Sequence, residues 1–472
     1  MFENEIHKLT TLILEVCREN DLPVEALKIN SIPFNGEWGV ATSFFAAAAA
    51  EARSGKKVNV PKRAAELAVF VAERLNLPEG FSRVEAVRGY LNIYFEPSTF
   101  AKKVFKTIFL EGDAFGKSPS TGKKILVEFS QPNTHKAFHV GHLRNMILGG
   151  AVCNILEWAG NDVVRVNYIG DIGLHVMKWL WNYQKHHAGE TPGDAPVKWL
   201  GEIYAEAARL FEEDPSVEPE VRALFGSWHH GDEELTALWK KTRNWSMEAF
   251  LQLYHQIGIH FDHIYYESEV EHSGIELVEQ LIEDGIAKDE RPEESVIVPL
   301  DDLLGLEEEY RVLVVLRSDG TSLYSTKDLA LAIKKFEDFH PDESVYIIDV
   351  RQSLYLKQIF KTLEIMGHPE IAKRCIHLPY EIVNLPGNVT MSSREGTVVL
   401  LEDLINEATE RAFSVVTEKN PELPAEKRRE IASAVALGSI KYTMVSIDNK
   451  KIVTFDWEKA LDFNGQAAPY MQ

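Results

Sequence analysis

The chain has 472 residues, more than one hydrophobic core usually organises, so we expect about three domains. Hydrophobic residues make up 45% and charged residues 26% of it, close to the globular average, which excludes disordered, collagen-like and fibrous classes. The formal net charge is −22, but residues 201–310 hold 28 acidic and only 7 basic side chains, so the remainder is almost neutral and a nucleic-acid surface there stays open.

The cysteines Cys17, Cys153 and Cys375 are far apart and odd in number, so we expect neither a disulfide framework nor a zinc site. The first residues, Met1–Lys8, are polar, and no apolar stretch approaches the roughly 18 residues of a membrane-spanning helix. We therefore expect no signal peptide and no membrane partner. Together these features predict a cytoplasmic location.

Residues 1–115 are predicted to form a small α+β domain. The alanine-rich stretch Thr42–Arg53 and the stretch Pro61–Leu75, which begins with proline, are both typical of helices. Arg88–Phe95 alternates in polarity as a strand does. A generic packing domain would show the same pattern, and the polar stretch Gly116–Lys124 is predicted to be a linker.

A different pattern begins after this linker, and residues 120–385 are predicted to form an α/β domain. The apolar stretch Ile125–Phe129 is a predicted strand, and after a polar loop His139–Gly160 is a predicted helix. A second strand follows at Val163–Ile169. This order is a βαβ unit, which predicts a parallel, doubly wound sheet.

An acidic block at about residues 185–310 interrupts this domain and is predicted to be helical. Strands return at Val312–Arg317 and Ser344–Asp349, so we expect the block to be an insertion between two halves of one sheet. Residues 386–472 are predicted to hold a Gly- and Ser-containing loop and then a mainly helical region, in which Glu430–Val445 has the spacing of a buried helix.

The first crossover carries the candidate chemistry, because ligands of parallel sheets bind where a strand's carboxyl end leads into a helix. His139 and His142 are three residues apart at the helix start, beside the free N–H groups and the positive end of the helix dipole, which suits phosphate. Gly141 lacks a Cβ, which would let a base lie against the backbone. A capped helix start or a metal-binding pair of histidines would give the same spacing.

These residues also resemble a known family. The segment Ser130–Asn145, SQPNTHKAFHVGHLRN, is similar to the nucleotide-binding signature of class I aminoacyl-tRNA synthetases in its arginine-specific form. The segment NYIGDIG at Asn167–Gly173 also matches, with Ile172 in place of the usual tryptophan. Further matches are SDGTSLYSTKDLA, MSSREGTVVLLEDL and DFNGQAAPYMQ, which begin at Ser318, Met391 and Asp462.

The resemblance implies a Rossmann-like catalytic domain and proposes residues that hold arginine. A guanidinium is planar and rich in donors, so its capture calls for carboxylates. The positions that match arginine-binding residues of the family are Glu128, Asn133, Tyr324, Asp328 and Gln352. Two local interpretations stay open. Asp328 could belong to a capping box that starts at Ser325, and Glu128, in a strand, needs either a cation or a solvent-facing side.

The resemblance also implies the reaction. Arginine attacks the α-phosphorus of ATP, which is accompanied by Mg²⁺, and the terminal ribose of tRNA then takes the aminoacyl group. His139 and His142 would donate hydrogen bonds to the phosphates, with Gly141 beneath the nucleotide. Residues that match the family's mobile ATP-binding loop are Met391, Ser392, Ser393 and Arg394, which lack both of its usual lysines. In family members that lack the second of these lysines, a lysine just upstream of the histidine motif is thought to replace it, and Lys136 occupies that position.

The nucleic-acid side rests on the first domain, which resembles the family's extra domain that contacts the outer corner of tRNA. Asn35-Gly36-Glu37-Trp38 matches an element of that domain, and Trp38 is the candidate to stack on a base, although a core aromatic is an equal interpretation. The family's C-terminal anticodon-binding domain does not follow Gln472, so we expect weak tRNA charging.

The resemblance implies an ATP-dependent arginine–tRNA ligase that acts in protein biosynthesis through an arginyl-adenylate, here as its N-terminal and catalytic portion. Its expected partners are L-arginine, ATP and tRNA(Arg), and we expect a monomer. Two alternatives stay open. One is another class I synthetase or nucleotidyltransferase with the same histidine loop, and the other is a catalytically weak or idle truncated paralogue that binds tRNA or protein.

Overall fold

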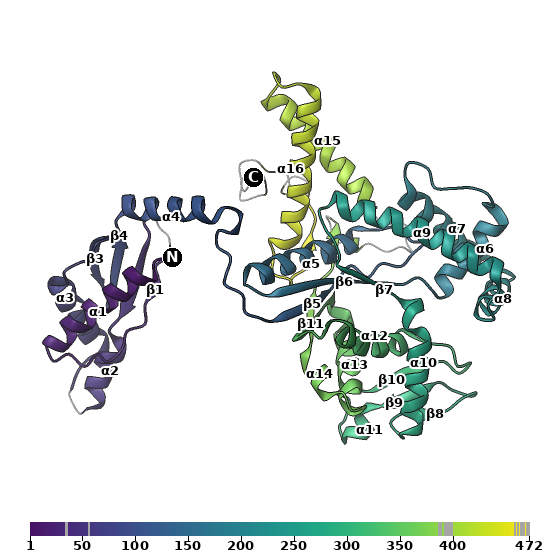
Figure 1. Ribbon diagram of the computed structural model, residues 1–472, viewed down its shortest axis with the longest axis horizontal. Coiled ribbons are helices and arrows are strands. Elements are labelled where there is room, and N and C mark those ends of the chain that lie inside the picture. The colour runs from purple at the N-terminus through teal and green to yellow at the C-terminus, as the bar shows by residue number, and fades with distance from the viewer. Residues whose placement is uncertain are drawn as a thin grey trace. The chain divides into compact units, whose positions relative to one another are not determined.

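The computed structural model describes residues 1–33, 36–54, 57–385, 389–390 and 400–456, together with Lys459, Asp462 and Ala468. The chain divides into two compact units, residues 1–116 and residues 117–472 (Figure 1). Asn35 and the loop residues Met391, Ser392, Ser393 and Arg394, which the sequence analysis singled out, lie outside the described residues.

The first unit is an antiparallel sheet of order β1-β2-β4-β3 with helices packed on it. Its core contains Leu91, Ile93 and Phe95, the buried side of the alternating strand. The helix expected from Thr42 begins three residues later, because Thr42 still pairs in β2. Its elements are α1 Glu3–Glu19, β1 Asn30–Ser31, β2 Gly39–Ser43, α2 Phe45–Arg53, α3 Val60–Arg74, β3 Phe81–Val87, β4 Tyr90–Phe95, α4 Pro97–Glu111 and a 3₁₀ turn Gly112–Ala114.

The second unit is built on a five-stranded sheet of order β12-β11-β5-β6-β7, in which every neighbouring pair is parallel. The predicted parallel, doubly wound sheet is therefore confirmed. The chain runs outward from β5 in one direction and later returns to β5's other side with β11, so the strand order reverses beside β5. The bounds of the strands and their first crossover are β5 Lys124–Glu128, α5 Val140–Trp158, β6 Asp162–Ile169, β7 His263–Tyr266, β11 Glu343–Asp349 and β12 Cys375–Tyr380.

Helices cover both faces of this sheet, and strand alternation decides which residue meets which face. Ile125, Val127 and Phe129 share a core with Cys153 of α5. Leu126 shares the opposite core with Ala330 and Leu331 of α12. In Figure 1 the strands accordingly lie between α5 above and α12 below. The remaining helices of this part are α10 Glu267–Glu283, α12 Tyr324–Phe339, α13 Ser353–Ile365 and α14 Pro369–Arg374, with a 3₁₀ turn Val350–Gln352 before α13.

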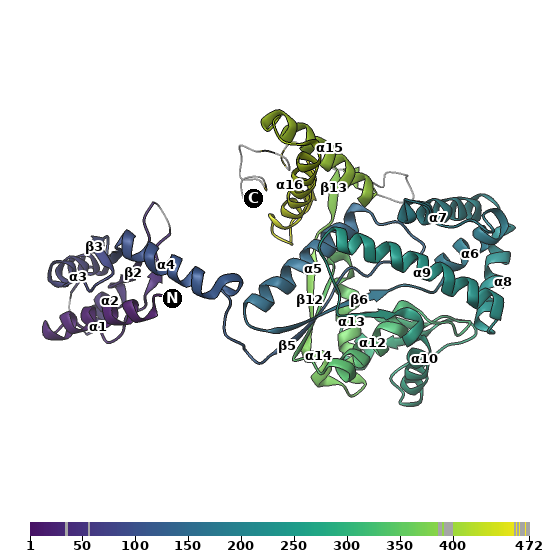
Figure 2. The same ribbon diagram turned by 45° about the horizontal axis from the view of Figure 1, so that its top comes forward.

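The acidic block is not one helical insertion between two halves of the sheet. Its helices are followed by the edge strand β7, which pairs with β6 inside the expected insertion range 185–310. A strand of four residues is too short to stand out from helical flanks in sequence. In Figure 2 α6, α7, α8 and α9 gather at one end of the unit. Their bounds are α6 Leu174–His186, α7 Pro196–Glu213, α8 Val217–His229 and α9 Glu233–Gln256.

The strand expected at Val312–Arg317 is present, but its assignment to the parallel sheet is wrong. It forms β10 of a separate antiparallel sheet, β10-β9-β8, where Val312 pairs with Pro299. An apolar run predicts a strand without naming its partner, because pairing depends on residues elsewhere in the chain. The elements here are β8 Lys288–Asp289, β9 Val296–Pro299, α11 Leu300–Leu304 and β10 Val312–Leu316.

The last part of the chain packs against α5 through a buried arginine. Arg144 of α5 donates hydrogen bonds to the carbonyls of Ile382 at 3.1 Å and Lys451 at 2.9 Å, and also to that of Glu381. It therefore ties α5 to both ends of the helical region, which includes the expected helix near Glu430. The elements are β13 Val383–Leu385, β14 Val389–Thr390, α15 Leu401–Lys419, α16 Ala425–Val445 and β15 Val453–Thr454.

Across the described part of the chain, no helix combines the length and apolarity that a membrane crossing requires. Cys17, Cys153 and Cys375 are buried free thiols, and burial raises the pKa of each.

Replacing Arg144 with Met should lower the free energy of unfolding of the second unit by about 3 kcal/mol, because several carbonyls lose the buried guanidinium that donates to them. Urea denaturation followed by tryptophan fluorescence measures the change. Arg209→Met is the control, since Arg209 makes an exposed ion pair with Glu213 and no other ion pair with a described residue. Equal midpoints for the two variants would contradict the anchoring role.

Candidate active site

The two histidines of the first crossover bind the helix backbone through the same ring atom. His139 is the N-cap residue of α5, and its Nδ1 accepts the Gly141 N–H at 3.1 Å. The Nδ1 of His142 accepts the His139 N–H at 3.2 Å. Because Nδ1 is the acceptor in both rings, the proton of each neutral imidazole lies on Nε2. The capped helix start is thus present, and it leaves both Nε2–H groups for a ligand.

Both imidazoles are neutral at physiological pH. Burial, followed by the nearby Lys136 ammonium, lowers the pKa of His139 to about 4. Burial, His139 and Lys136 lower the pKa of His142 well below its usual value. The histidines can therefore donate hydrogen bonds to phosphate oxygens as neutral groups.

Gly141 has a local reason to lack a side chain. A Cβ there would lie 2.8 Å from Cε1 of the His139 ring, closer than real contacts allow. The glycine thus makes room for the capping imidazole, which the sequence analysis had not foreseen.

One cavity of about 410 Å³ brings together all five residues proposed to hold arginine, Glu128, Asn133, Tyr324, Asp328 and Gln352. It lies at the carboxyl ends of β5, β6 and β11, and the strand order reverses between β5 and β11, which is the usual ligand position in such sheets. Asn133 approaches Gly170 so closely that a Cβ on Gly170 would clash with it at 2.2 Å. Neither His139 nor His142 lines this cavity.

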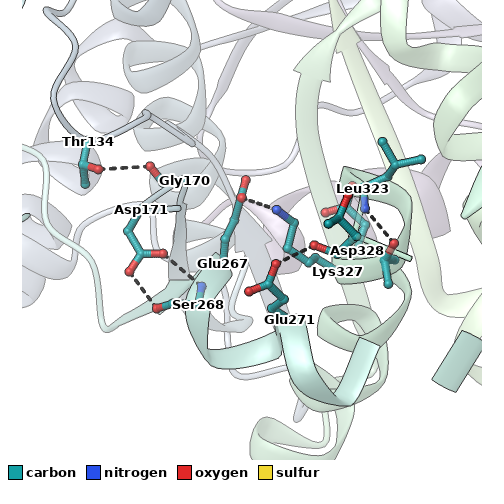
Figure 3. A network of polar contacts seen from close by, with 12 residues as sticks. Thr134, Gly170, Asp171, Glu267, Ser268, Glu271, Leu323, Lys327 and Asp328 are labelled. Carbon is teal, nitrogen blue, oxygen red and sulfur yellow. Dashed lines mark hydrogen bonds and ion pairs between the residues drawn. The ribbon is translucent and has the colours of Figure 1, made fainter. Parts of the chain in front are cut away.

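The first turn of α12 places Tyr324 and Asp328 on the cavity. The helix begins at Tyr324, so these two residues, four apart, share a face. The capping-box interpretation of Asp328 is wrong. Thr326 Oγ1 accepts the Leu323 N–H at 2.9 Å, whereas Asp328 accepts the Tyr355 hydroxyl at 2.5 Å (Figure 3 labels Leu323 and Asp328).

Two of the three buried carboxylates at the cavity have a lysine partner. Glu128 forms an ion pair with Lys335, and both side chains are buried. Its other oxygen accepts from Gln131 at 3.1 Å, so protein groups already occupy both oxygens of Glu128. Glu267, the first residue of α10, is paired with Lys327 (Figure 3).

Asp328 is the exception, because no cation pairs with it among the described residues. Burial raises its pKa to about 6, against the lowering effect of the Tyr355 hydroxyl. With Glu128 and Glu267 matched by lysines, the cavity carries one carboxylate more than it has cations. It therefore suits a ligand group with a single positive charge.

Lys136 lines a second cavity of about 340 Å³, which shares Glu267 and Tyr324 with the first. Its ammonium lies 4.8 Å from the centre of the Tyr204 ring. Burial and Lys178 lower the Lys136 pKa, while Glu267 opposes them. The Lys136 ammonium also lowers the pKa of both imidazoles, so its charge interacts with the histidines and with the Glu267 carboxylate.

The segment after β6 holds the start of α10 in position. Asp171 is buried, and its carboxylate accepts hydrogen bonds from the N–H and hydroxyl of Ser268, at 2.9 and 2.7 Å (Figure 3). It also accepts from Arg243 at 3.0 Å. These bonds fix Glu267, the neighbour of Ser268, at the cavity wall. Ile172, which stands where the family that the sequence resembles usually has tryptophan, is buried in the core formed by α6 to α9.

The family described as tRNA synthetases class I (R), catalytic domain, matches residues 105–457. The chain belongs to this class I arginyl-tRNA synthetase family.

Curated relatives and solved structures agree with this assignment. The chain is 34% identical to the arginine–tRNA ligase of Clostridium perfringens over 409 residues, which are 86% of this chain and 70% of the relative. It is 37% identical to that of Bdellovibrio bacteriovorus over 392 residues, or 81% and 66% of the two chains. The structure resembles Thermus thermophilus arginyl-tRNA synthetase with a TM-score of 0.71 and 25% identity. This match covers 98% of this chain and 79% of that one.

In this synthetase's first unit, Trp38 is not a core residue. Its side chain is 52% exposed and stacks on Phe100 with ring centres 5.6 Å apart. It lines a groove of about 330 Å³ with Gly36 and Glu37. The interpretation of Trp38 as a core aromatic is therefore wrong.

The structure of the synthetase adds residues that the sequence analysis missed. Lys335 is seven residues after Asp328, two helical turns on, so periodicity could have placed it on the same face. Tyr168 is two residues after Val166 in β6, so strand alternation could have assigned the two side chains to the same face of the sheet. No local signal marks Tyr355, because its contact with Asp328 arises only when α13 packs on α12.

Arginine affinity should depend on the ionisation of Asp328. A cation binds the ionised carboxylate, so protonation competes, and affinity should fall as pH drops through about 6, the Asp328 pKa. We expect binding at pH 5 to be roughly tenfold weaker than at pH 8, measured by isothermal titration calorimetry. Glu267, whose pKa burial raises to about 7, should add a smaller effect in the same direction.

Two variants serve as controls for this pH dependence. Asp328→Asn should abolish measurable binding without lowering Tm, because it removes a buried charge. Asp338→Asn, on the same helix but outside the cavity, should keep both the affinity and its pH dependence. Binding that is unchanged between pH 5 and 8 would exclude Asp328 as the ligand carboxylate.

Proposed function

We propose that this chain ligates L-arginine to tRNA(Arg) in two steps, through an arginyl-adenylate formed with ATP. The observation that carries the proposal is that, among the described residues, no cation pairs with Asp328, while the other buried carboxylates of the cavity, Glu128 and Glu267, each have a lysine partner. Family membership supports the reaction class, and this charge balance supports arginine as the amino acid.

The arginine side chain would enter the 410 Å³ cavity with its guanidinium on Asp328. A carboxylate accepts two parallel N–H groups of a guanidinium, which adds directional specificity to charge. Glu128 would attract the guanidinium by its charge without binding it directly, since Lys335 and Gln131 already contact its oxygens. Asn133, Tyr324 and Gln352 line the same cavity and are the polar groups available to the rest of the amino acid.

ATP would bind at the start of α5, with its phosphates facing the Nε2–H groups of His139 and His142. Leu400, which follows the residues proposed for the ATP-binding loop, forms a backbone bridge with His139. This contact supports a role for Met391, Ser392, Ser393 and Arg394 beside the same nucleotide. Catalysis would then consist of positioning and of stabilising charge on the phosphate oxygens.

Magnesium fits this site as a companion of ATP. Among the described residues no group of three or more His, Cys, Asp or Glu side chains is arranged to hold a metal ion. Magnesium commonly keeps waters and binds substrate phosphates, which would satisfy it without a protein cage. When bound, it would neutralise part of the phosphate charge.

The tRNA would reach the protein on two surfaces. Its terminal ribose would approach from the Lys136 cavity, which adjoins the arginine cavity through Glu267 and Tyr324. Trp38 would stack on a base in the first unit.

We also propose that the protein acts as a monomer in the cytoplasm, where its free thiols stay reduced.

ATP–pyrophosphate exchange over a panel of amino acids tests the function. Among the amino acids we expect exchange only with arginine, and only when tRNA(Arg) is present, because arginine enzymes of this family characteristically require tRNA for activation. Exchange with a different amino acid would favour another class I synthetase. No exchange with any amino acid, with tRNA still bound, would favour the idle paralogue.

Lys136→Ala should reduce the rate of arginine-dependent exchange by about a hundredfold, because one preorganised positive group near the phosphates is lost. Lys178→Ala is the matched control, since Lys178 neighbours Lys136 electrostatically but lies over the Phe211 ring. Both variants should keep the Tm of the parent. Equal activity in the two variants would remove Lys136 from the mechanism.

A further inference from the structure

The hydroxyl of Tyr168 is a buried polar group without a hydrogen-bond partner among the described residues. Tyr168 lies near the end of β6, is 8% exposed and lines the 410 Å³ cavity. Its hydroxyl oxygen is inaccessible to solvent and forms no hydrogen bond with any described residue. Such a group costs free energy in the folded protein, so it calls for an explanation.

Neighbouring buried tyrosines show what a satisfied hydroxyl looks like here. The Tyr254 hydroxyl lies 2.7 Å from the Ser130 hydroxyl and accepts from Asn167 at 3.0 Å. The Tyr355 hydroxyl donates to Asp328 at 2.5 Å. Tyr168 differs from both because its hydroxyl has no such partner among the described residues, while its side chain lines the cavity.

The surroundings of Tyr168 are anionic. Burial, followed by Asp328, Glu267 and Glu128, raises the pKa of Tyr168 well above its usual value, so its hydroxyl stays neutral. Strand pairing places it on the same face of the sheet as Glu128, since Glu128 is opposite Val166 and Tyr168 is two residues further along β6. A neutral oxygen therefore lies among carboxylates, close to the one that lacks a cation.

A guanidinium has more donors than one carboxylate can accept. It offers five N–H groups in a plane, of which a carboxylate takes two. The others need acceptors that do not add further negative charge to a buried site. A phenolic oxygen meets that need, whereas an additional carboxylate would require its own cation.

We propose that Tyr168 is a specificity-determining residue of the arginine site, whose phenolic oxygen accepts an N–H from the guanidinium held by Asp328. This inference rests on the proposed function and adds to it a residue that reads the shape of the ligand's cation. A lysine ammonium has its donors on one nitrogen, so it cannot span Asp328 and Tyr168 as a planar fork does.

The test is Tyr168→Phe, which removes only the hydroxyl. Isothermal titration calorimetry is run with L-arginine, with L-argininamide, which keeps the guanidinium but lacks the carboxylate, and with L-lysine. We expect arginine and argininamide each to bind Tyr168→Phe about tenfold more weakly than they bind the parent protein, because a hydrogen bond to a charged group is lost. The weak binding of lysine should be unchanged, so arginine loses part of its advantage.

Thermal unfolding of the free protein provides the second measurement. Tyr168→Phe should not lower Tm, because no protein group loses a partner. Tyr254→Phe is the matched control, and it should lower Tm by stranding Ser130 and Asn167 while leaving the arginine affinity of the folded protein unchanged.

Distinct outcomes overturn distinct claims. Equal arginine affinity in Tyr168→Phe and the parent would overturn the inference and leave the proposed function standing. A Tm loss like that of Tyr254→Phe would overturn it too, because the hydroxyl would then have a protein partner. A loss for arginine but not argininamide would move the contact to the carboxylate and refute the guanidinium assignment. No arginine binding by the parent would overturn the proposed function, and this inference with it.

Discussion

An ionised carboxylate that is buried without a cation raises the free energy of a folded protein, and Asp328 is in that position. Its only hydrogen-bond donor among the described residues is the Tyr355 hydroxyl. The surrounding charges make this cost specific, because Lys335 and Lys327 match Glu128 and Glu267 and leave one negative charge over. A ligand that supplies one buried positive charge repays the cost, and a neutral ligand does not.

The parallel sheet determines where this charge imbalance can occur. Strand alternation directs one set of β5 residues into the core under α5 and the other set, which includes Glu128, toward α12. The carboxyl ends of the strands open at the point where the strand order reverses, so side chains from the sheet, from α12 and from α13 reach one cavity. Asp171, through Ser268, then fixes the first turn of α10 beside it.

The proposed nucleotide end and the proposed amino-acid end of the site are held by different kinds of interaction. His139 and His142 are oriented by backbone N–H groups of one helix turn, so their geometry is local to α5. The carboxylates depend on contacts between helices and strands far apart in the chain. Lys136 is near both sets, and its pKa responds to Glu267 while it lowers the pKa of both imidazoles. Arg144 links the same helix to the carbonyls that flank the C-terminal region.

Local features of this protein follow from the sequence alone. The apolar run before His139 and the helix after it predict the first crossover, because strand and helix periodicities are properties of neighbouring residues. The resemblance of several segments to one family pointed to the five residues that line one cavity. Only the tertiary structure decided that β10 belongs to a separate sheet, that Asp328 bonds Tyr355 and not its own helix start, and that Glu128 is neutralised by Lys335. Each of these depends on groups distant in the chain, whose approach is set by packing and not by local pattern.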